Sequence, residues 1–259
     1  MATSPHIDVR GLTHVYSNGR RALTALSGVD LAVARGEFVS VIGPSGGGKT
    51  TLLKAVGGLI SPSSGEIQVG GYLPREAQGL KLLGFVFQDP SLLPWRSVAA
   101  NIALPMELAG QDRSRRQEAL AGLLGAVGLA GFADYYPGQL SGGMRQRVAL
   151  ARALAADPDV LIMDEPLGSL DEITREAMGY ELLRIWDLAK KTVLMVTHSI
   201  PEAVMLSDRV IVMSQRPGRV VDDIPIDLER PRSESLARSW QFLEYVDRTK
   251  EALAGQTSW

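Results

Sequence analysis

The stretch Val39–Leu59, VSVIGPSGGGKTTLLKAVGGL, joins a short apolar run to a glycine-rich loop and then to a helical pattern. Residues Gly43 to Thr50 match the motif G-x-x-x-x-G-K-[ST] at every fixed position. Glycines let successive backbone N–H groups turn inward around a phosphate. The helix that follows directs the positive end of its dipole at the anion. The sequence therefore predicts a phosphate-binding loop between a strand and a helix.

The residue types of this loop have separate tasks. Lys49 can reach the β- and γ-phosphates of a nucleotide, and Thr50 can place its hydroxyl on Mg²⁺. A glycine-rich turn without a ligand is the alternative, but a chance match in a chain of this length occurs only about once in a hundred. The predicted nucleotide contacts of the loop are Gly43, Ser45, Gly46, Gly47, Gly48, Lys49, Thr50 and Thr51.

The bulk composition is that of an ordinary globular protein. The chain has 259 residues, of which 45% are apolar and 22% charged, and its formal net charge is -2. This balance indicates no general affinity for nucleic acid, and the basic run Arg113–Glu118 is typical of a solvated helix face. The absence of cysteine excludes disulfides and thiolate metal sites.

The sequence shows neither a signal-peptide pattern at its start nor an apolar run near the ~20 residues of a membrane-spanning helix. We therefore expect any work at a membrane to go through a partner protein.

Apolar strand patterns alternate with helical patterns, which favours a parallel sheet covered on both faces. The chain between residues 89 and 156 is mostly helical in pattern, and strand patterns return after it. Residues 216–228 are typical of a late hairpin, and residues 235–255 of a closing amphipathic helix.

Two acids end the buried-strand pattern Val160–Pro166, VLIMDEP. Asp164 fits a carboxylate that holds Mg²⁺ through its water shell. Strand alternation directs Glu165 to the other side, toward a water in line with the γ-phosphate, where it would act as general base. Solvated acids at a strand end are the alternative, and the phosphate loop upstream disfavours it.

Gln88 and His198 also end predicted strands. Loops beyond the carboxyl ends of strands are where an open α/β sheet binds its ligand. Either residue alone is typical of an ordinary strand end, but beside the acids we expect Gln88 to sense Mg²⁺ or water and His198 to hydrogen-bond the γ-phosphate. The predicted catalytic residues are Glu165, His198 and Gln88, and the predicted Mg²⁺ residues are Thr50, Gln88 and Asp164.

A second anion-binding helix start lies in Leu140–Pro166, LSGGMRQRVALARALAADPDVLIMDEP. Ser141 is a good helix N-cap, and Gly142 and Gly143 leave the backbone donors of that helix start uncovered. A helical insert separates this helix start from the phosphate loop, so two chains arranged head-to-tail could each complete the other's site. The alternative is a capped helix with no ligand.

This stretch resembles the signature motif of ABC-type ATPases, and the other elements of that family occur in order along residues 6 to about 230. The Q-loop corresponds to Gln88, the acidic strand end to Asp164 and Glu165, and the switch histidine to His198. The resemblance adds further nucleotide contacts. Tyr16 would stack on adenine, and Asp171 belongs to the loop GSLD that crosses between two cassettes. The signature motif contributes Ser141, Gly142 and Gly143.

The resemblance implies an α/β fold: a P-loop ABC ATPase cassette with an N-terminal antiparallel β part, a mostly parallel core sheet and a helical subdomain. Within a single domain over 1–259, it places the nucleotide-binding core at 1–88 and 157–231. The helical subdomain with the Q-loop and signature motif covers 89–156, and a C-terminal helical tail covers 232–259.

The resemblance also implies a dimer that encloses two ATP with Mg²⁺, in which Ser141 and Gly143 contact the γ-phosphate held by the other subunit. That subunit is a second copy or a homologous cassette. The expected partners are a membrane permease, docked through the helical subdomain and the Q-loop region, and indirectly an extracytoplasmic solute-binding protein. We expect no nucleic-acid partner and a peripheral position on the cytoplasmic face of the inner or plasma membrane.

Residues Phe85–Leu108 and Ser214–Ser233 are similar to the branch that imports nitrate, sulfonates, taurine and bicarbonate. The expected function is therefore the ATP-hydrolysing subunit of an importer for a small anion. An importer subunit for another small solute and a soluble, non-transport ABC ATPase are the alternatives. A small-molecule kinase would have no use for the LSGGM motif.

Two departures from the family pattern are visible, GGGKTT in place of GCGKST and GSLD in place of GALD. Both keep the needed chemistry, because Thr50 still supplies a hydroxyl and Asp171 is retained. After Gln88, the apolar residues Leu92, Leu93 and Trp95 are either the core of the helical insert or part of the groove that receives a helix of the permease.

Overall fold

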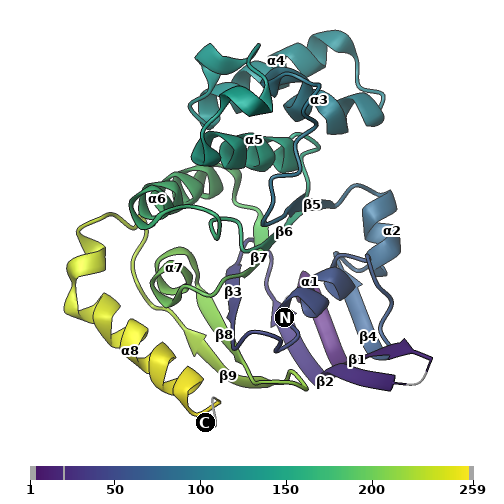
Figure 1. Cartoon of the computed structure of the whole chain (residues 1–259), viewed down its shortest axis with the longest axis vertical. Coiled ribbons are helices and arrows are strands. Elements are labelled where there is room, and N and C mark those ends of the chain that lie inside the picture. Colours follow the sequence, from purple (N-terminus) through teal and green to yellow (C-terminus); the bar gives the residue numbers. More distant parts are fainter. Residues whose placement is uncertain (1–3, 20, 257–259) are drawn as a thin grey trace.

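The computed structural model describes residues 4–19 and 21–256 and contains two sheets (Figure 1). Strands β1 (Ile7–Asn18), β2 (Arg21–Val33) and β4 (Ser64–Val69) form an antiparallel sheet in the order β2-β1-β4. Of the predicted core and tail, residues 1–3, 20 and 257–259 lie outside the described residues. The predicted N-terminal antiparallel part is confirmed.

The second sheet has six strands in the order β5-β6-β7-β3-β8-β9. The first five are parallel, and β9 is antiparallel to β8. Strands β3 and β7 are buried along their whole length because helices and the first sheet cover both faces. The bounds are Phe38–Ile42 for β3, Leu83–Val86 for β5, Val160–Asp164 for β6, Thr192–Val196 for β7, Arg209–Met213 for β8 and Val220–Pro225 for β9.

Helix α1 (Lys49–Val56) packs into the apolar core that the two sheets share. Leu52, Leu53 and Val56 are buried there, and each buried side chain of this size stabilises the fold by about 1.5–3 kcal/mol relative to its exposed state. This packing fixes the start of α1, and therefore the phosphate loop before it, against the end of β3.

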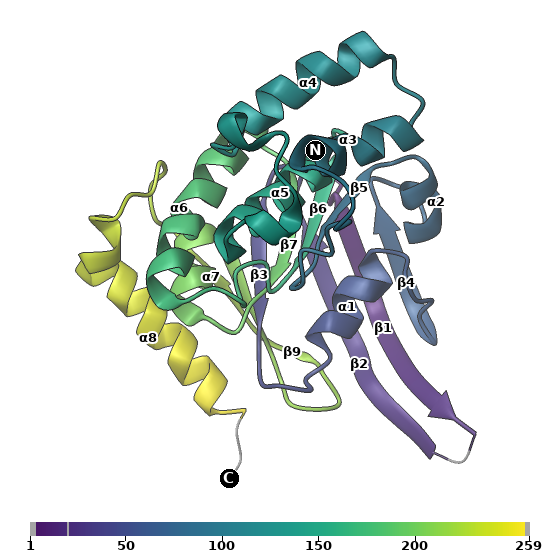
Figure 2. The ribbon, with the colours of Figure 1, turned by 45° about the horizontal axis from the view of Figure 1, so that its top comes forward.

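Helices α3 (Val98–Leu108), α4 (Arg113–Ala126) and α5 (Gly142–Leu154) gather at one end of the molecule in both views (Figures 1 and 2). Ser97 and Ser141 cap α3 and α5, each accepting a hydrogen bond from a backbone N–H of the first turn. Two 3₁₀ turns, Ala130–Phe132 and Pro137–Gln139, join α4 to α5. The division of the chain into core, helical subdomain and tail stays a prediction.

The carboxyl-terminal half adds α6 (Glu172–Ala189), α7 (Ile200–Leu206), a 3₁₀ turn (Leu236–Arg238) and α8 (Trp240–Ala254). Helix α8 packs on α7 and β8, on the side of the molecule away from β1 and β2 (Figure 2). Over residues 4–19 and 21–256, every helix is too short or too polar to cross a membrane.

Three local differences from the sequence prediction have physical reasons. The strand expected to end at Gln88 ends at Val86, because β5 is an edge strand whose pairing stops at Met163 of β6. Helix α2 (Pro74–Gly79) was not predicted, since six residues are too few to show a helical period. The late hairpin pairs β8 with β9 across the turn 214–219, so its first strand precedes the expected range.

Candidate functional site

The phosphate loop leaves the end of β3 and returns into α1 with Gly48 as N-cap. Gly48 has a φ of 84°, and a methyl group there would lie 2.7 Å from the carbonyl oxygen of Ala25. A residue with a side chain is therefore disfavoured both by backbone conformation and by space, and the loop would have to shift to accept it. The ammonium of Lys49 donates to the carbonyl oxygens of Gly43 at 2.8 Å and Pro44 at 2.9 Å, which holds it across the loop.

Burial lowers the pKa of Lys49, and the carboxylates of Glu165 and Asp164 oppose this effect. Burial likewise raises the pKa of Asp164, whereas the hydroxyl of Thr50 and the nearby lysines act in the opposite direction. A cation and two acids thus share a partly desolvated site, where electrostatic interactions are stronger than in water.

Glu165 is the point where the predicted catalytic residues meet. One of its carboxylate oxygens, Oε2, accepts a hydrogen bond from Gln88 Nε2 at 3.2 Å and lies 3.3 Å from His198 Nδ1. These residues follow β6, β5 and β7, which are neighbours in the sheet. Parallel strands bring their carboxyl ends to one edge, so three positions far apart in the sequence converge.

The direction of Glu165 has a different cause from the one predicted. Strand β6 ends at Asp164, so strand alternation does not decide where the next side chain points. Glu165 takes a left-handed backbone with a φ of 47°, and its N–H donates to the carbonyl oxygen of Val196 at 2.8 Å. This turn places its side chain in the cavity of the phosphate loop, a backbone state that is uncommon for a residue with a side chain.

A cavity of about 310 Å³ surrounds the loop. Tyr16 is 42% exposed at its wall, and its hydroxyl is 3.3 Å from Oγ1 of Thr51. The lining includes three residues that the sequence did not predict, namely Leu23, Ala25 and Arg216. Leu23 and Ala25 come from β2, where no local motif marks them. Arg216 comes from the β8–β9 turn, within the stretch Ser214–Ser233 whose resemblance to an importer branch assigned it no role. The full lining is Tyr16, Leu23, Ala25, Ser45, Gly46, Gly47, Gly48, Lys49, Thr50, Thr51, Glu165 and Arg216.

The oxygen donors at this site fit Mg²⁺. Thr50 Oγ1 lies 3.3 Å from Asp164 Oδ1, and a magnesium ion bound with a nucleotide needs only one or two protein oxygens besides water and phosphate. In the described part of the chain no group of three or more His, Cys, Asp or Glu side chains forms a metal site of its own. A bound Mg²⁺ would neutralise phosphate charge, and Thr50 and Asp164 would hold it.

The signature residues lie outside this cavity. Ser141 caps α5, with its Oγ accepting from the N–H of Met144 at 3.3 Å, and Gly142 lines a different cavity beside Gln88 and Ser169. Gly143 packs closely on α6, where a methyl group would lie 3.2 Å from Cγ2 of Thr174. Within one chain, the two predicted anion-binding helix starts therefore face separate spaces.

Asp171, predicted as a nucleotide contact, caps α6 in this structure. Its carboxylate accepts from the N–H of Thr174 at 3.0 Å and from the hydroxyl of the same residue at 2.7 Å. These bonds to Thr174 lower the pKa of Asp171. The side chain is on the surface and does not line the loop cavity.

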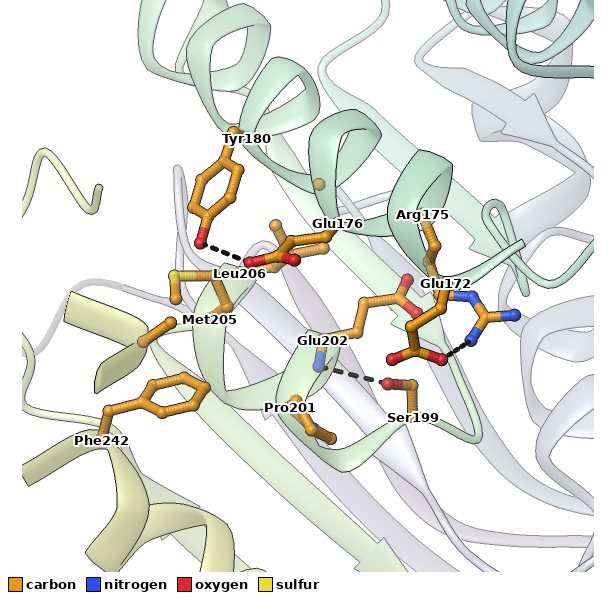
Figure 3. A pocket seen from close by; sticks show the side chains of 12 residues that line it. Glu172, Arg175, Glu176, Tyr180, Ser199, Pro201, Glu202, Met205, Leu206 and Phe242 are labelled. Atoms are coloured by element: carbon orange, nitrogen blue, oxygen red, sulfur yellow. Dashed lines mark hydrogen bonds and ion pairs between the residues drawn. The ribbon is translucent and has the colours of Figure 1, made fainter. Parts of the chain in front are cut away.

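A further cavity of about 280 Å³ lies between α6, α7 and α8 (Figure 3). Glu202 reaches this region from α7, and its Oε2 accepts a hydrogen bond from the hydroxyl of Thr197 at 2.9 Å. Its other oxygen is buried without a partner among the described residues. Burial raises the pKa of Glu202 to about 7, against smaller opposing effects of Thr197 and Arg175.

Stability is therefore expected to depend on pH through Glu202. Between its ordinary pKa and about 7, the folded chain holds a proton here that the unfolded chain releases, so stability falls as pH rises through this window. We expect the free energy of unfolding to drop by roughly 1–3 kcal/mol between pH 5 and 8 from this group.

Urea unfolding of Glu202→Gln at several pH values tests this expectation, because the amide cannot titrate. Its stability should vary less with pH than that of the parent chain. Glu172→Gln is the control, since this glutamate lines the same cavity with an exposed side chain. A Glu202→Gln chain with the parent's pH slope would contradict the assignment.

The site consists of a strand, a glycine loop with its lysine, and a helix. An acidic strand end lies at the same edge of the sheet. This arrangement defines a P-loop nucleotide-binding protein. The family model described as ABC transporter matches residues 26–168. Because that match covers more than half of the sequence, and because relatives align along most of it, the chain belongs to the ABC transporter family of ATP-binding proteins.

The relatives include the nitrate import ATP-binding protein NrtD of Synechocystis sp., 39% identical over 257 residues, which covers 97% of this chain and 96% of that protein. The taurine import ATP-binding protein TauB of Burkholderia pseudomallei is 46% identical over 216 residues, or 83% of this chain and 82% of that one.

Among solved structures, the dimeric, post-hydrolysis state of the ATP-binding cassette MJ0796 bound to ADP and Pi is similar, with a TM-score of 0.75 and 32% identity over 86% of this chain and 100% of that one. These likenesses confirm the predicted family and fold. The chain is an ABC ATP-binding subunit, homologous to the ATPase subunits of nitrate and taurine importers.

Proposed function

We propose that this chain hydrolyses Mg-ATP and that the energy drives import of a small anion through a separate permease. The observation that carries the proposal is the meeting of Gln88 and His198 on one carboxylate oxygen of Glu165, at the wall of the phosphate-loop cavity. A site that only binds nucleotide has no need of this arrangement.

The proposed roles follow from geometry and chemistry. Glu165 is the general base for the attacking water, a role worth about 10²–10⁴-fold in rate. His198 hydrogen-bonds the γ-phosphate. Gln88 donates a hydrogen bond to Glu165 and senses the Mg²⁺ or its water. Thr50 and Asp164 hold Mg²⁺, and Tyr16 stacks on the adenine.

The active form is proposed to be a dimer. Ser141 and Gly143 lie outside the loop cavity of their own chain, so they serve a nucleotide only if a second cassette brings its phosphate loop to them. The similarity to a cassette that is dimeric with ADP and Pi supports this arrangement. Asp171, at the surface beside the signature helix, would lie at the contact between the two chains.

The permease is proposed to dock on the helical subdomain beside Gln88, which would hold the chain peripherally on the cytoplasmic face of the membrane. Trp95 is 72% exposed, whereas Leu92 packs against the core. The exposed indole therefore supports an interface at Trp95. The relatives that import nitrate and taurine support a small anion as the solute.

Trp95→Ala is expected to weaken the complex with the permease and to leave basal ATPase activity of the isolated chain unchanged. The matched control is Trp240→Ala, because that indole is 71% exposed on α8, away from the helical subdomain. The complex would be purified in mild detergent from native membranes and its subunits identified.

A polytopic permease that is retained by the parent and by Trp240→Ala but lost from Trp95→Ala supports the proposal. Only soluble partners for the parent chain would contradict the transport role. Equal recovery of the permease with both tryptophan variants would contradict the docking surface.

A further inference from the structure

The turn between β8 and β9 packs directly against the phosphate loop. A methyl group on Gly47 would lie 2.5 Å from the carbonyl oxygen of Ser214, and one on Gly43 would lie 2.7 Å from that of Met213. From the other side, a methyl group on Gly218 would overlap the carbonyl oxygen of Gly47. Glycines are therefore needed where the two loops meet, because the backbones touch without intervening side chains.

Hydrogen bonds fix this turn in place. The N–H of Gly218 donates to the carbonyl oxygen of Ala25 at 2.9 Å, and the N–H of Ser27 donates to the carbonyl oxygen of Gly218 at 3.0 Å. Inside the turn, Ser214 Oγ accepts from the N–H of Arg219 at 3.1 Å. The turn is thus tied to β2 and closed on itself, so whatever it carries is held beside the phosphate loop.

The turn carries Arg216 into the nucleotide cavity. A guanidinium nitrogen of Arg216, Nη2, lies 3.1 Å from the position that a methyl group on Gly46 would take, and the residue lines the cavity with Lys49. Among the described residues, Arg216 makes no hydrogen bond and no ion pair within the chain. By contrast, Arg209 and Arg230, from the same part of the chain, are both paired with carboxylates.

We propose that Arg216 binds the phosphate chain of the nucleotide, as a second cation beside Lys49. This inference rests on the proposed function and adds a binding residue from outside the phosphate loop and the acidic strand. The guanidinium offers planar, paired donors that match phosphate oxygens, and such charge-assisted bonds are about twice as strong as neutral ones. The backbone donors of the loop supply only partial charges.

The experiment measures Mg-ATP and Mg-ADP binding by titration calorimetry for the full chain and its variants. Arg216→Ala is expected to raise the Kd for both nucleotides about tenfold or more, since charge-assisted bonds of this kind are worth roughly 1.5–3 kcal/mol. Arg216→Lys should recover part of the loss. The Kd of Arg216→Ala should also depend less on KCl concentration, because one ion contact is gone.

Arg219→Ala is the matched control, because it is an exposed arginine of the same turn that does not line the cavity. Its Kd should stay within twofold of the parent value. A Kd for Arg216→Ala that equals that of Arg219→Ala overturns the inference. A loss that is the same for adenosine as for ATP also overturns it, since Arg216 would then contact the base or ribose.

Lys49→Ala separates the inference from the proposed function. If Lys49→Ala abolishes nucleotide binding and Arg216→Ala does not weaken it, the site is a nucleotide site and only the role of Arg216 is wrong. If the parent chain itself does not bind Mg-ATP, the proposed function fails. Thermal unfolding of each variant checks that the fold is intact, which we expect because Arg216 makes no side-chain bond within the described chain.

Discussion

Glu165→Gln is expected to lower the rate of phosphate release from Mg-ATP by about 10²–10⁴-fold. The amide has the size of the carboxylate and can still accept a hydrogen bond from Gln88, but it cannot take a proton from water. The phosphate loop and its lysine are untouched, so nucleotide binding should persist. Because bound ATP would not be consumed, this variant should also accumulate as a dimer in gel filtration with Mg-ATP.

The control for this experiment is Glu176→Gln, an exposed glutamate of α6 that does not line the loop cavity. Its phosphate release should match that of the parent chain. A Glu165→Gln chain with near-normal turnover would contradict the general-base role. A Glu165→Gln chain that binds Mg-ATP but stays monomeric at saturating nucleotide would contradict the proposal that two chains share each nucleotide site.

Gly48→Ala is expected to lower turnover on the order of 10²-fold, because displacement of a binding group by about 1 Å has an effect of that size. The added methyl group would lie 2.6 Å from a methyl carbon of Leu26 and 2.7 Å from the carbonyl oxygen of Ala25. The loop must then move away from β2, which shifts the N-cap of α1 and the lysine that follows it.

The matched control is Gly71→Ala. Gly71 has the same φ of 84°, but a methyl group there would meet no atom within 4 Å. Both variants carry the cost of a left-handed alanine, about 1–2 kcal/mol, so the difference between them isolates the crowding at the loop. Steady-state phosphate release and urea unfolding would be measured for both. Equal turnover of the two variants would show that the loop tolerates the displacement.

Most of the fold was predictable because it rests on local patterns. The strand patterns placed the ends of β3, β6 and β7 within a few residues, since apolar side chains must recur at the spacing of the element that buries them. The edge strand β5 and the six-residue helix α2 were less predictable. Strand β5 pairs with one neighbour only, and α2 is too short to show a helical period.

The catalytic group illustrates the limit of the same reasoning. Glu165 was found from its place after a buried strand, yet its direction comes from a left-handed backbone and a hydrogen bond to Val196. The hydrogen bond depends on the neighbouring strand β7, which follows only after the long helix α6. The structure thus places Glu165 in the loop cavity for a different geometric reason from the one predicted, and its catalytic role stays a prediction.

The sequence by itself determined the phosphate loop, the acidic strand end and the signature helix, because each is a contiguous motif whose chemistry follows from residue type and spacing. Only the tertiary structure decided that Gln88 and His198 meet on one oxygen of Glu165, that Ser141 lies outside its own loop cavity, and that Arg216 lies beside Gly46. The physical reason is that strand order and turn packing join positions that are 33 and 77 residues apart at Glu165 and farther still at Arg216. No local pattern encodes which ends meet.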